Sequence, residues 1–439
     1  MAESSTQPIG VIVAGGLATR MGEATQRQPK TLLPVAGVSV LERQLEQFER
    51  AGIERVVVLA GHLAEMIEAV TARRSAASRP AVEVRIEDRP LGSGGCLGLL
   101  DDLCGPAIVA LGDVLFELDL RELVEAHRRA EALLTAAIHP NEHPHDSDLV
   151  ELDASGRIVA LHPKPHPPRA RLRNLVTAGL FVIEPELIAE LPPIPELAKL
   201  DLVQDLLAGA VAEGRPVQGW QTTAYLKDMG TPRRYAEAER DFARGIPAAR
   251  RRPRPTVFLD RDGTLNRHVG YLRAPEQLEL LPGVAEAVAA LNAAELQVVV
   301  VTNQPVIARG ELDEAGLEAI HAELEGQLAR AGAYLDRVYY CPHHPDAGFE
   351  GERPELKIAC RCRKPGVGMI EAACAELLVD RARSVLIGDH ERDLGAALAA
   401  GLRPILVGPE TRALAKAQGV EWFPSLAQAC APLISEGPC

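Results

Sequence analysis

Short apolar runs alternate with amphipathic stretches along nearly the whole chain. The runs are IGVIVAGG, RVVVLAGH, AVEVRIED, PAIVALGD and AGLFVIE in the first half, and TVFLDRDG, LQVVVVTNQ, RSVLIGD and RPILVG in the second. Stretches between them, such as VLERQLEQFERAG, have helical periodicity. This pattern predicts an α/β protein with mostly parallel sheets covered by helices. Ligands of such sheets bind at the carboxyl ends of the strands, where Gly and Asp residues fall in both halves.

One segment interrupts this pattern. ARGIPAARRRPRP, residues 243–255, is basic, contains three prolines and lacks apolar periodicity. It is more typical of a solvated linker than of a nuclear-localisation signal or an anion-binding surface. We therefore expect two Rossmann-like domains, over residues 1–242 and 256–439.

Composition and charge narrow the class of protein. The formal net charge is −14, which disfavours nucleic-acid partners. No apolar run is long enough to span a bilayer, and MAESSTQPIG lacks the regions of a signal peptide, so we expect a cytoplasmic protein without a membrane partner. Eight cysteines in 439 residues do not suggest a disulfide scaffold, and a local cluster of them favours a metal site.

The glycines in VIVAGGLATRMG follow the first predicted strand. Gly15 and Gly16 allow backbone N–H groups to approach phosphate oxygens, and Arg20 lies a few residues on. Lys30, in PKTLLPV, adds a cation suited to a phosphate. A glycine-rich turn alone is a common structural device, but the lysine favours a phosphate site.

Two carboxylates in the first half are candidates for a magnesium site. Asp113 ends the strand in VALGDVLF, and Asp228 lies in the turn of YLKDMGTPRRY. Mg²⁺ binds through one or two carboxylates together with substrate phosphates. Each aspartate, taken singly, is equally compatible with a helix cap or a turn.

The motifs VAGGLATRMG, PKTLLPV, EDRPLGSGG, LGDVLF, TAGLFVIE and LKDMGTPRRY occur in this order over residues 8–241. The set resembles the sugar-1-phosphate nucleotidyltransferase family, apart from Ala18, where that family usually has glycine. The resemblance implies that a sugar 1-phosphate attacks the α-phosphate of a nucleoside triphosphate and that pyrophosphate leaves. The implied roles are triphosphate binding by Gly15, Gly16 and Arg20, charge stabilisation by Lys30, Mg²⁺ binding by Asp113 and Asp228, base contact by Gly92 and Ser93, sugar-phosphate binding by Lys164, and sugar-hydroxyl binding by Glu184.

The second half begins with a different constellation. FLDRDGTLN places Asp260 just past a strand and Asp262 two residues later, a spacing that suits one nucleophile and one general acid and base, although D-x-D pairs also bind Ca²⁺ or cap helices. Thr302 ends a strand as a hydroxyl donor, and Lys364 in RCRKP supplies a cation. Asp389 and Asp393, in VLIGDHERD, can complete a Mg²⁺ site with Asp260 and Asp262.

The combination DxDGT, T-N, K-P and GDxxxD over residues 256–408 strongly resembles the haloacid dehalogenase superfamily of phosphatases. No insertion is long enough for a separate cap domain. LDRDGTLN, GYL, VTNQ and CPHHP look like the D-glycero-D-manno-heptose 1,7-bisphosphate phosphatases, with histidinol-phosphate phosphatases as the competing assignment. Asn303, Arg309 and Arg363 are candidate substrate contacts, and either arginine is also compatible with a surface position.

YYCPHHPDAGFEGERPELKIACRCRKP contains a candidate metal centre. Cys341 and His343 form one close pair, and Cys360 and Cys362 form a second, with sixteen residues between the pairs. Four such ligands suit a tetrahedral zinc site without an open catalytic position, so we expect structural zinc. His344 is a spare neighbour, and family resemblance favours His343 as the ligand.

Together the halves predict a bifunctional enzyme of nucleotide-activated heptose synthesis. The resemblance implies that the phosphatase would convert heptose 1,7-bisphosphate to heptose 1-phosphate, and that the nucleotidyltransferase would join this product to a nucleoside monophosphate. GTP is the favoured donor by resemblance, whereas ATP, CTP and UTP stay open. The alternatives are a hexose or alditol nucleotidyltransferase fused to another phosphatase, or a chain with one inactive half. The sequence does not indicate an oligomeric state.

Overall fold

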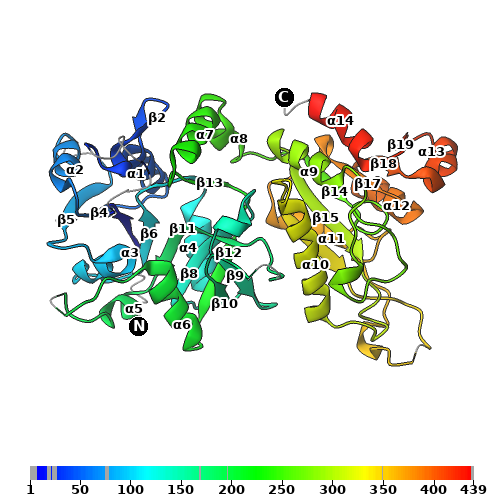
Figure 1. Cartoon of the computed structure of the whole chain (residues 1–439), viewed down its shortest axis with the longest axis horizontal. Helices are drawn as coiled ribbons and strands as arrows, with labels where there is room; N and C mark the ends of the chain where they lie inside the picture. Colours follow the sequence, from blue (N-terminus) through cyan, green and yellow to red (C-terminus); the bar gives the residue numbers. More distant parts are fainter. Residues whose placement is uncertain are drawn as a thin grey trace. The chain divides into compact units, whose positions relative to one another are not determined.

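The computed structural model describes residues 7–16, 21, 27–74, 79–167, 170–194, 196–348 and 350–436. The chain divides into two compact units (Figure 1). The first comprises Met1–His139, Val150–Pro163 and Val176–Arg251, and the second comprises Pro140–Leu149, Lys164–Leu175 and Arg252–Cys439. Within the described ranges, no helix combines the length and the apolar composition that crossing a lipid bilayer requires.

The first unit is built on a nine-stranded mixed sheet. Its central strands are parallel, with β1 between β4 and β6, and β5 beyond β4; β11 runs antiparallel to both β6 and β8. The strands are β1 (Ile9–Val13), β4 (Arg55–Ala60), β5 (Ala81–Ile86), β6 (Ala107–Leu111), β8 (Leu134–His139), β9 (Leu149–Leu152), β10 (Ile158–His162), β11 (Val176–Ile183) and β12 (Val217–Gln221). Each apolar run predicted to be a strand in this half is one, and the motifs that end β1 and β6 lie at neighbouring strand ends.

Helices bury apolar stripes against one face of this sheet. α1 (Val40–Arg50) begins with a capping box formed by Ser39 and Glu42, which satisfies backbone N–H groups of its first turn. Its residues Leu41, Leu45 and Phe48 recur at helical spacing and pack with alternate residues of β1, β4 and β6. α2 (Ala64–Thr71) and α4 (Leu120–Arg129) add to the same core cluster.

Two further elements complete the first unit next to its candidate site. β7 (Val114–Glu117) pairs antiparallel with β13 (Tyr225–Asp228). α7 (Pro232–Ala243) follows β13 and packs Ala238 into a small cluster with Tyr225. The segment predicted to be a linker includes a helix, α8 (Ile246–Ala249), whose Ile246 joins that cluster. The junction between the units follows at Arg251.

The second unit contains a six-stranded sheet in which every pairing is parallel. The spatial order is β16-β15-β14-β17-β18-β19, a doubly wound arrangement with β14 at the point where the strand order reverses. The strands are β14 (Thr256–Leu259), β15 (Gln297–Asn303), β16 (Arg337–Cys341), β17 (Val385–Gly388), β18 (Arg403–Val407) and β19 (Glu421–Phe423). The predicted α/β class, with one α/β fold in each half of the chain, is confirmed.

Both faces of this sheet are covered, which explains its continuous apolar strands. In β15, Val298 and Val300 face the cluster that contains α9, α10 and α14, whereas Val299 and Val301 face the cluster that contains α11 and α12. The helices are α9 (Val284–Ala293), α10 (Glu314–Ala329), α11 (Gly368–Glu376), α12 (Glu391–Ala400), α13 (Arg412–Gln418) and α14 (Leu426–Glu436). The carboxyl ends of β14, β15 and β17 carry the predicted phosphatase motifs.

Candidate active sites and metal centre

A cavity of about 400 Å³ lies at the carboxyl ends of β1 and β6 in the first unit. Its walls include six residues predicted to hold the nucleotide or its magnesium: Gly15, Gly16, Lys30, Gly92, Ser93 and Asp113. Cavities at this edge of parallel sheets are the usual place for a nucleotide. The structure therefore gathers these residues around one space, while their individual roles stay predictions.

Two glycines allow an acidic side chain to enter this cavity. A Cβ atom on Gly15 would lie 2.5 Å from Glu87 Oε1, so a larger residue there would displace the carboxylate. A Cβ atom on Gly61 would likewise clash with this oxygen, so glycine at both positions leaves room for the carboxylate. The N–H of Leu91 donates to Glu87 Oε2 at 2.9 Å. Sequence reasoning missed Glu87, whose only signal is an acidic residue shortly before PLGSGG.

Burial raises the pKa of Glu87, while the Leu91 N–H and the positive charge of Lys199 oppose that rise. Lys199 also lines the cavity. The cavity thus contains a half-buried carboxylate at one wall and the cation Lys30 at another. This arrangement can bind a ligand that carries both phosphates and hydrogen-bond donors.

The two predicted magnesium ligands of the first unit lie close to each other in the fold. Asp228 ends β13 opposite Val114, and the N–H of Met229 donates to the carbonyl of Asp113 at 2.8 Å. Each carboxylate pairs with a cation: Asp113 with Lys30 at 2.7 Å, and Asp228 with Arg234 at 3.0 Å. Asp113 also lines the cavity, so the pair stays the predicted magnesium site of this unit.

The segment around Gly92 is fixed by the chain that follows Ala198. Gly92 has a φ of +82°, and a Cβ atom there would overlap the carbonyl of Leu200. The Ser93 hydroxyl donates to Asp201 Oδ2 at 2.9 Å and accepts from the N–H of Leu202 at 2.9 Å. Both residues line the cavity, yet these contacts give them a structural task that the sequence did not indicate.

Two predicted residues, Glu184 and Lys164, do not take part in this arrangement. Glu184 follows β11, which runs antiparallel to β6, so it lies beside the start of β6 and pairs with His127 at 3.0 Å. The resemblance placed it at the sugar, but the strand direction carries it to the opposite edge of the sheet. Lys164 belongs to the second unit and donates to the carbonyl of Asp146 at 2.6 Å. Arg20 and its neighbour Ala18 lie outside the described residues.

The second unit brings its predicted acids and lysine together after β14 and β17. Lys364 Nζ lies 2.8 Å from Asp260 Oδ1 and 2.6 Å from Asp393 Oδ1, and its side chain is 2% exposed. Asp393 also accepts from the N–H of His390 at 3.0 Å in the capping box of α12. A buried lysine between two carboxylates holds Asp260 in a fixed orientation.

Three carboxylates in this site converge closely enough to bind one cation. Ligand oxygens of Asp260, Asp389 and Asp393 all lie within 4.8 Å of one another. Burial and the neighbouring acids raise the pKa of Asp389 to about 7, and burial together with Asp393 raises that of Asp260 to about 6 despite Lys364. A magnesium ion would relieve this repulsion, so the donor set fits it. The carboxylate of Asp262 is not in this group.

Asp262 is held by a separate set of donors. Asn266 Nδ2 donates to its Oδ1 at 3.0 Å, and Gln304 Nε2 donates to its Oδ2 at 2.8 Å. Gln304 also donates to the buried hydroxyl of Thr302 at 2.9 Å, which leaves the Thr302 O–H available for another acceptor. Gln304 was not among the predicted residues, although it completes the T-N-Q end of β15.

The other predicted contacts of this site have identifiable partners. Asn303 clamps the backbone of Lys364: its Nδ2 donates to the carbonyl at 3.0 Å and its Oδ1 accepts from the N–H at 2.9 Å. Arg309 donates to Glu311 at 2.7 Å and lies over the Tyr271 ring. Arg363 donates to the carbonyl of His343 at 3.2 Å. Arg363 therefore joins the phosphatase loop to the cysteine cluster.

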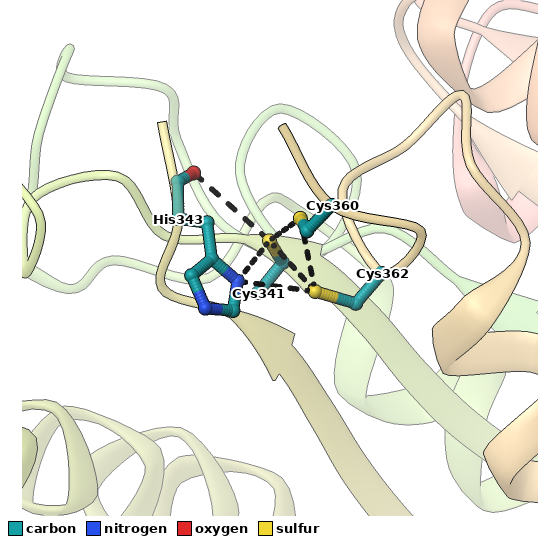
Figure 2. Close-up of side chains that lie close together, drawn as sticks. All are labelled: Cys341, His343, Cys360 and Cys362. Carbon is teal, nitrogen blue, oxygen red and sulfur yellow. Dashed lines mark hydrogen bonds between the residues drawn. The ribbon is translucent and has the colours of Figure 1, made fainter. Parts of the chain in front are cut away.

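The four predicted zinc ligands point toward a common centre (Figure 2). The three sulfur–sulfur distances are 3.6 Å (Cys341–Cys360), 3.3 Å (Cys341–Cys362) and 3.2 Å (Cys360–Cys362). His343 Nδ1 lies 3.2 Å from the sulfur of Cys362. A tetrahedral zinc with bonds near 2.3 Å separates its sulfur ligands by about 3.8 Å, so the cluster can hold this ion after a small expansion.

Comparisons with known proteins match the two halves of the chain to two different families. A family profile described as nucleotidyl transferase matches residues 9–245, and one described as HAD-hydrolase-like matches residues 361–429. D-glycero-beta-D-manno-heptose-1,7-bisphosphate 7-phosphatase from Rhodopseudomonas palustris is 42% identical over 34% of this chain and 81% of its own length. The corresponding Escherichia coli K12 enzyme is 41% identical over 34% of this chain and 75% of its own.

Among solved structures, HddC from Yersinia pseudotuberculosis, complexed with GMP-PN, is 22% identical to this chain. It aligns over 54% of this chain and 100% of its own, with a TM-score of 0.46. The family profiles and curated relatives give a consistent assignment. The chain is an enzyme that belongs to the nucleotidyl transferase family over its first half and, through its haloacid dehalogenase-like half, to the family of phosphatases that contains these relatives.

Proposed function

We propose that this enzyme catalyses consecutive steps in the synthesis of a nucleotide-activated heptose. The phosphatase half removes the 7-phosphate of D-glycero-D-manno-heptose 1,7-bisphosphate, and the nucleotidyltransferase half joins the resulting heptose 1-phosphate to a nucleoside monophosphate. The observation that carries this proposal is the fusion itself: a nucleotidyl transferase shares one chain with a phosphatase whose curated relatives act on the heptose bisphosphate. The product of one site is then the substrate of the other.

The placement of Asp260 and Asp262 supports the proposed phosphatase step. Asp260 attacks phosphorus, forming an aspartyl-phosphate as the bond to the heptose O7 breaks, and Asp262 gives its proton to that oxygen. Asp262 then takes a proton from water, the water attacks phosphorus, and phosphate leaves Asp260. Lys364 and the Thr302 hydroxyl stabilise the phosphoryl oxygens. Magnesium held by Asp260, Asp389 and Asp393 would neutralise charge on the phosphate.

The nucleotidyl transfer needs positioning and charge stabilisation rather than a covalent intermediate. A phosphate oxygen of heptose 1-phosphate attacks the α-phosphorus of the nucleoside triphosphate, and pyrophosphate leaves. Gly15 and Gly16 bind the triphosphate through backbone N–H groups, and Lys30 stabilises the reacting phosphate. Asp113 and Asp228 would hold the magnesium that accompanies the triphosphate.

GTP is the proposed donor, and Glu87 supports it. Guanine is the one base of the four common nucleotides with two adjacent hydrogen-bond donors, N1–H and N2–H, on its pairing edge. A carboxylate offers two adjacent acceptors to such a pair. Glu87 lines the same cavity as Gly92 and Ser93, the residues predicted to contact the base. Adenine and cytosine would each place an acceptor against this carboxylate, which disfavours them.

Replacing Glu87 with Gln is expected to reduce the preference for GTP. The amide keeps one acceptor but places a donor against a guanine donor, so kcat/KM for GTP should fall roughly 10- to 100-fold, with smaller changes for the other triphosphates. Asp88→Asn, which removes the same charge from an exposed neighbouring residue, is the matched control. Pyrophosphate release measured with each triphosphate checks the prediction. An equal loss for all four would contradict base selection by Glu87.

The two-step assignment can be tested with the whole chain in one reaction. Incubation with the heptose 1,7-bisphosphate, Mg²⁺ and each nucleoside triphosphate should release phosphate and yield a nucleotide-heptose mass, fastest with GTP. Histidinol phosphate and hexose 1-phosphates serve as competing substrates. Absence of phosphate release from the bisphosphate would refute the heptose assignment. Phosphate release without any nucleotide sugar would refute the coupled reaction.

The cysteine cluster has a separate proposed role. We infer that Cys341, His343, Cys360 and Cys362 hold a structural zinc ion, because four protein ligands leave no open position for a substrate. The metal would close the loop that leads into Arg363 and Lys364. Reduced thiolates persist in a reducing compartment, which supports the proposed location in the cytoplasm.

A further inference from the structure

Arg261 lies between the two aspartates of the phosphatase motif, and its side chain turns inward. It is 0% exposed and is the largest of the fully buried side chains in the described part of the chain. Burial of a guanidinium is costly unless its hydrogen-bond donors find acceptors. The partners of this side chain therefore indicate what the buried charge is for.

The partners of the Arg261 side chain are Asp262, the proposed acid of the motif, and His321. Arg261 Nη2 donates to Asp262 Oδ2 at 2.8 Å, and Nε faces Oδ1 at 3.3 Å. Its remaining terminal nitrogen, Nη1, lies 3.4 Å from His321 Nε2. The planar guanidinium thus meets both oxygens of one carboxylate, a geometry that fixes the carboxylate plane as well as its position.

His321 supports Arg261 from α10. Its side chain is 0% exposed, and its ring packs against Tyr340 with centroids 5.9 Å apart. Burial lowers the pKa of His321 to about 4, so the ring is neutral and Nε2 can accept from Arg261. The N–H then lies on Nδ1, which faces Glu318 Oε1 at 3.8 Å. A neutral acceptor at this place holds Arg261 without repelling it.

We infer that Arg261 is a positioning residue for the proton transfers of Asp262, and that His321 holds Arg261 in place. The inference rests on the proposed aspartyl-phosphate mechanism. It concerns one event within it: protonation of the sugar oxygen as the bond to phosphorus breaks. An alkoxide leaves poorly without a proton, whereas p-nitrophenolate leaves readily as the anion. Misplacing Asp262 should therefore slow transfer of the phosphoryl group to Asp260 much more with the first kind of substrate than with the second. The later hydrolysis of the aspartyl-phosphate is the same for both substrates.

The test compares two substrates in the same full-length variants. With a sugar phosphate, Arg261→Lys keeps a positive charge but loses the planar fork, and the single-turnover rate of sugar release should fall roughly 100-fold. With p-nitrophenyl phosphate, the single-turnover rate of p-nitrophenol release should fall by no more than about 5-fold. His321→Leu should show the same pattern at roughly 10-fold, and His321→Gln, whose amide oxygen can accept from Arg261, should recover most of that loss.

Asp262→Asn provides the reference. It should show the same dependence on the leaving group, and adding Arg261→Lys to it should cause little further loss with the sugar phosphate. Equal losses with both substrates, or no loss with either, in Arg261→Lys would overturn the inference while leaving the proposed mechanism intact. If Asp262→Asn itself slows the single-turnover release of both leaving groups equally, the acid role proposed for Asp262 fails, and the inference fails with it. A thermal melt monitored by circular dichroism checks that the second unit of each variant is folded, because nucleotidyl transfer reports on the first unit alone.

Discussion

Asp260→Asn is expected to abolish phosphate release and to leave nucleotidyl transfer intact. An amide cannot attack phosphorus to form the aspartyl-phosphate, so kcat for the heptose bisphosphate should fall on the order of 10⁴-fold or more. The fold should survive this change. Burial and neighbouring acids already disfavour a charge at Asp260, and a neutral amide of the same shape removes that repulsion.

Two assays of one preparation separate the effects of this variant. Phosphate release from the bisphosphate measures the second unit, and pyrophosphate release from a supplied heptose 1-phosphate and GTP measures the first. Asp313→Asn is the matched control, because this exposed aspartate caps α10 and asparagine caps helices equally well. Phosphatase activity within tenfold of the unaltered enzyme would show that Asp260 is not the nucleophile. Loss of nucleotidyl transfer would show that the change acts beyond its own site.

The order of elements was predictable because both halves repeat a strong local pattern. Each run predicted as a strand, from IGVIVAGG to RPILVG, contains one, and the motif residues after them lie at strand ends. Several short strands were missed, among them β10 and β16, whose residues are mostly half-buried. Strand direction was also not encoded locally: β11 is as apolar as β6 but runs against it.

Pairings between distant side chains were the part that the sequence could not supply. The motifs identified Lys30 and Asp113, but not that they pair at 2.7 Å. Ser93 matched a base-contacting segment, yet its hydroxyl is used by Asp201 and Leu202. The reason is physical: hydrogen-bond partners depend on side-chain orientation and on contacts more than a hundred residues apart. Local periodicity carries no information about either.

The grouping of Cys341, His343, Cys360 and Cys362 was the most predictable part of the second unit, because close pairs of soft ligands have few other uses. What the sequence did not indicate is how the cluster connects to catalysis. Cys341 ends β16, and its carbonyl accepts from the N–H of Gln304, the residue that contacts Asp262, at 2.8 Å. From the other pair, Cys362 is followed by Arg363 and Lys364. The cluster is therefore tied to both sides of the candidate phosphatase site through the backbone.

Cys362→Ser is accordingly expected to remove the zinc and to destabilise the second unit. Structural zinc sites contribute folding free energy directly, with apparent binding free energies of about 10–16 kcal/mol in small zinc domains. Even a net loss of about 4 kcal/mol would lower the Tm of a unit of this size by roughly 10 °C. Elemental mass spectrometry measures the loss of zinc, and a thermal melt measures the loss of stability. Cys104→Ser, at an exposed cysteine of the first unit, is the control for the chemical change.

The same variant separates a structural zinc from a catalytic one. If the ion only holds the loop, zinc-depleted enzyme assayed well below its melting transition should keep most of its kcat, because Asp260, Asp262 and Lys364 supply the chemistry. If the ion were catalytic, its removal would abolish nearly all phosphatase activity at every temperature. His343→Ala should lose the metal, whereas His344→Ala should retain it, since His343 is the histidine grouped with the three cysteines. A zinc-free but folded protein with an unchanged Tm would contradict the structural role, since closing this loop is the contribution that the metal is expected to make.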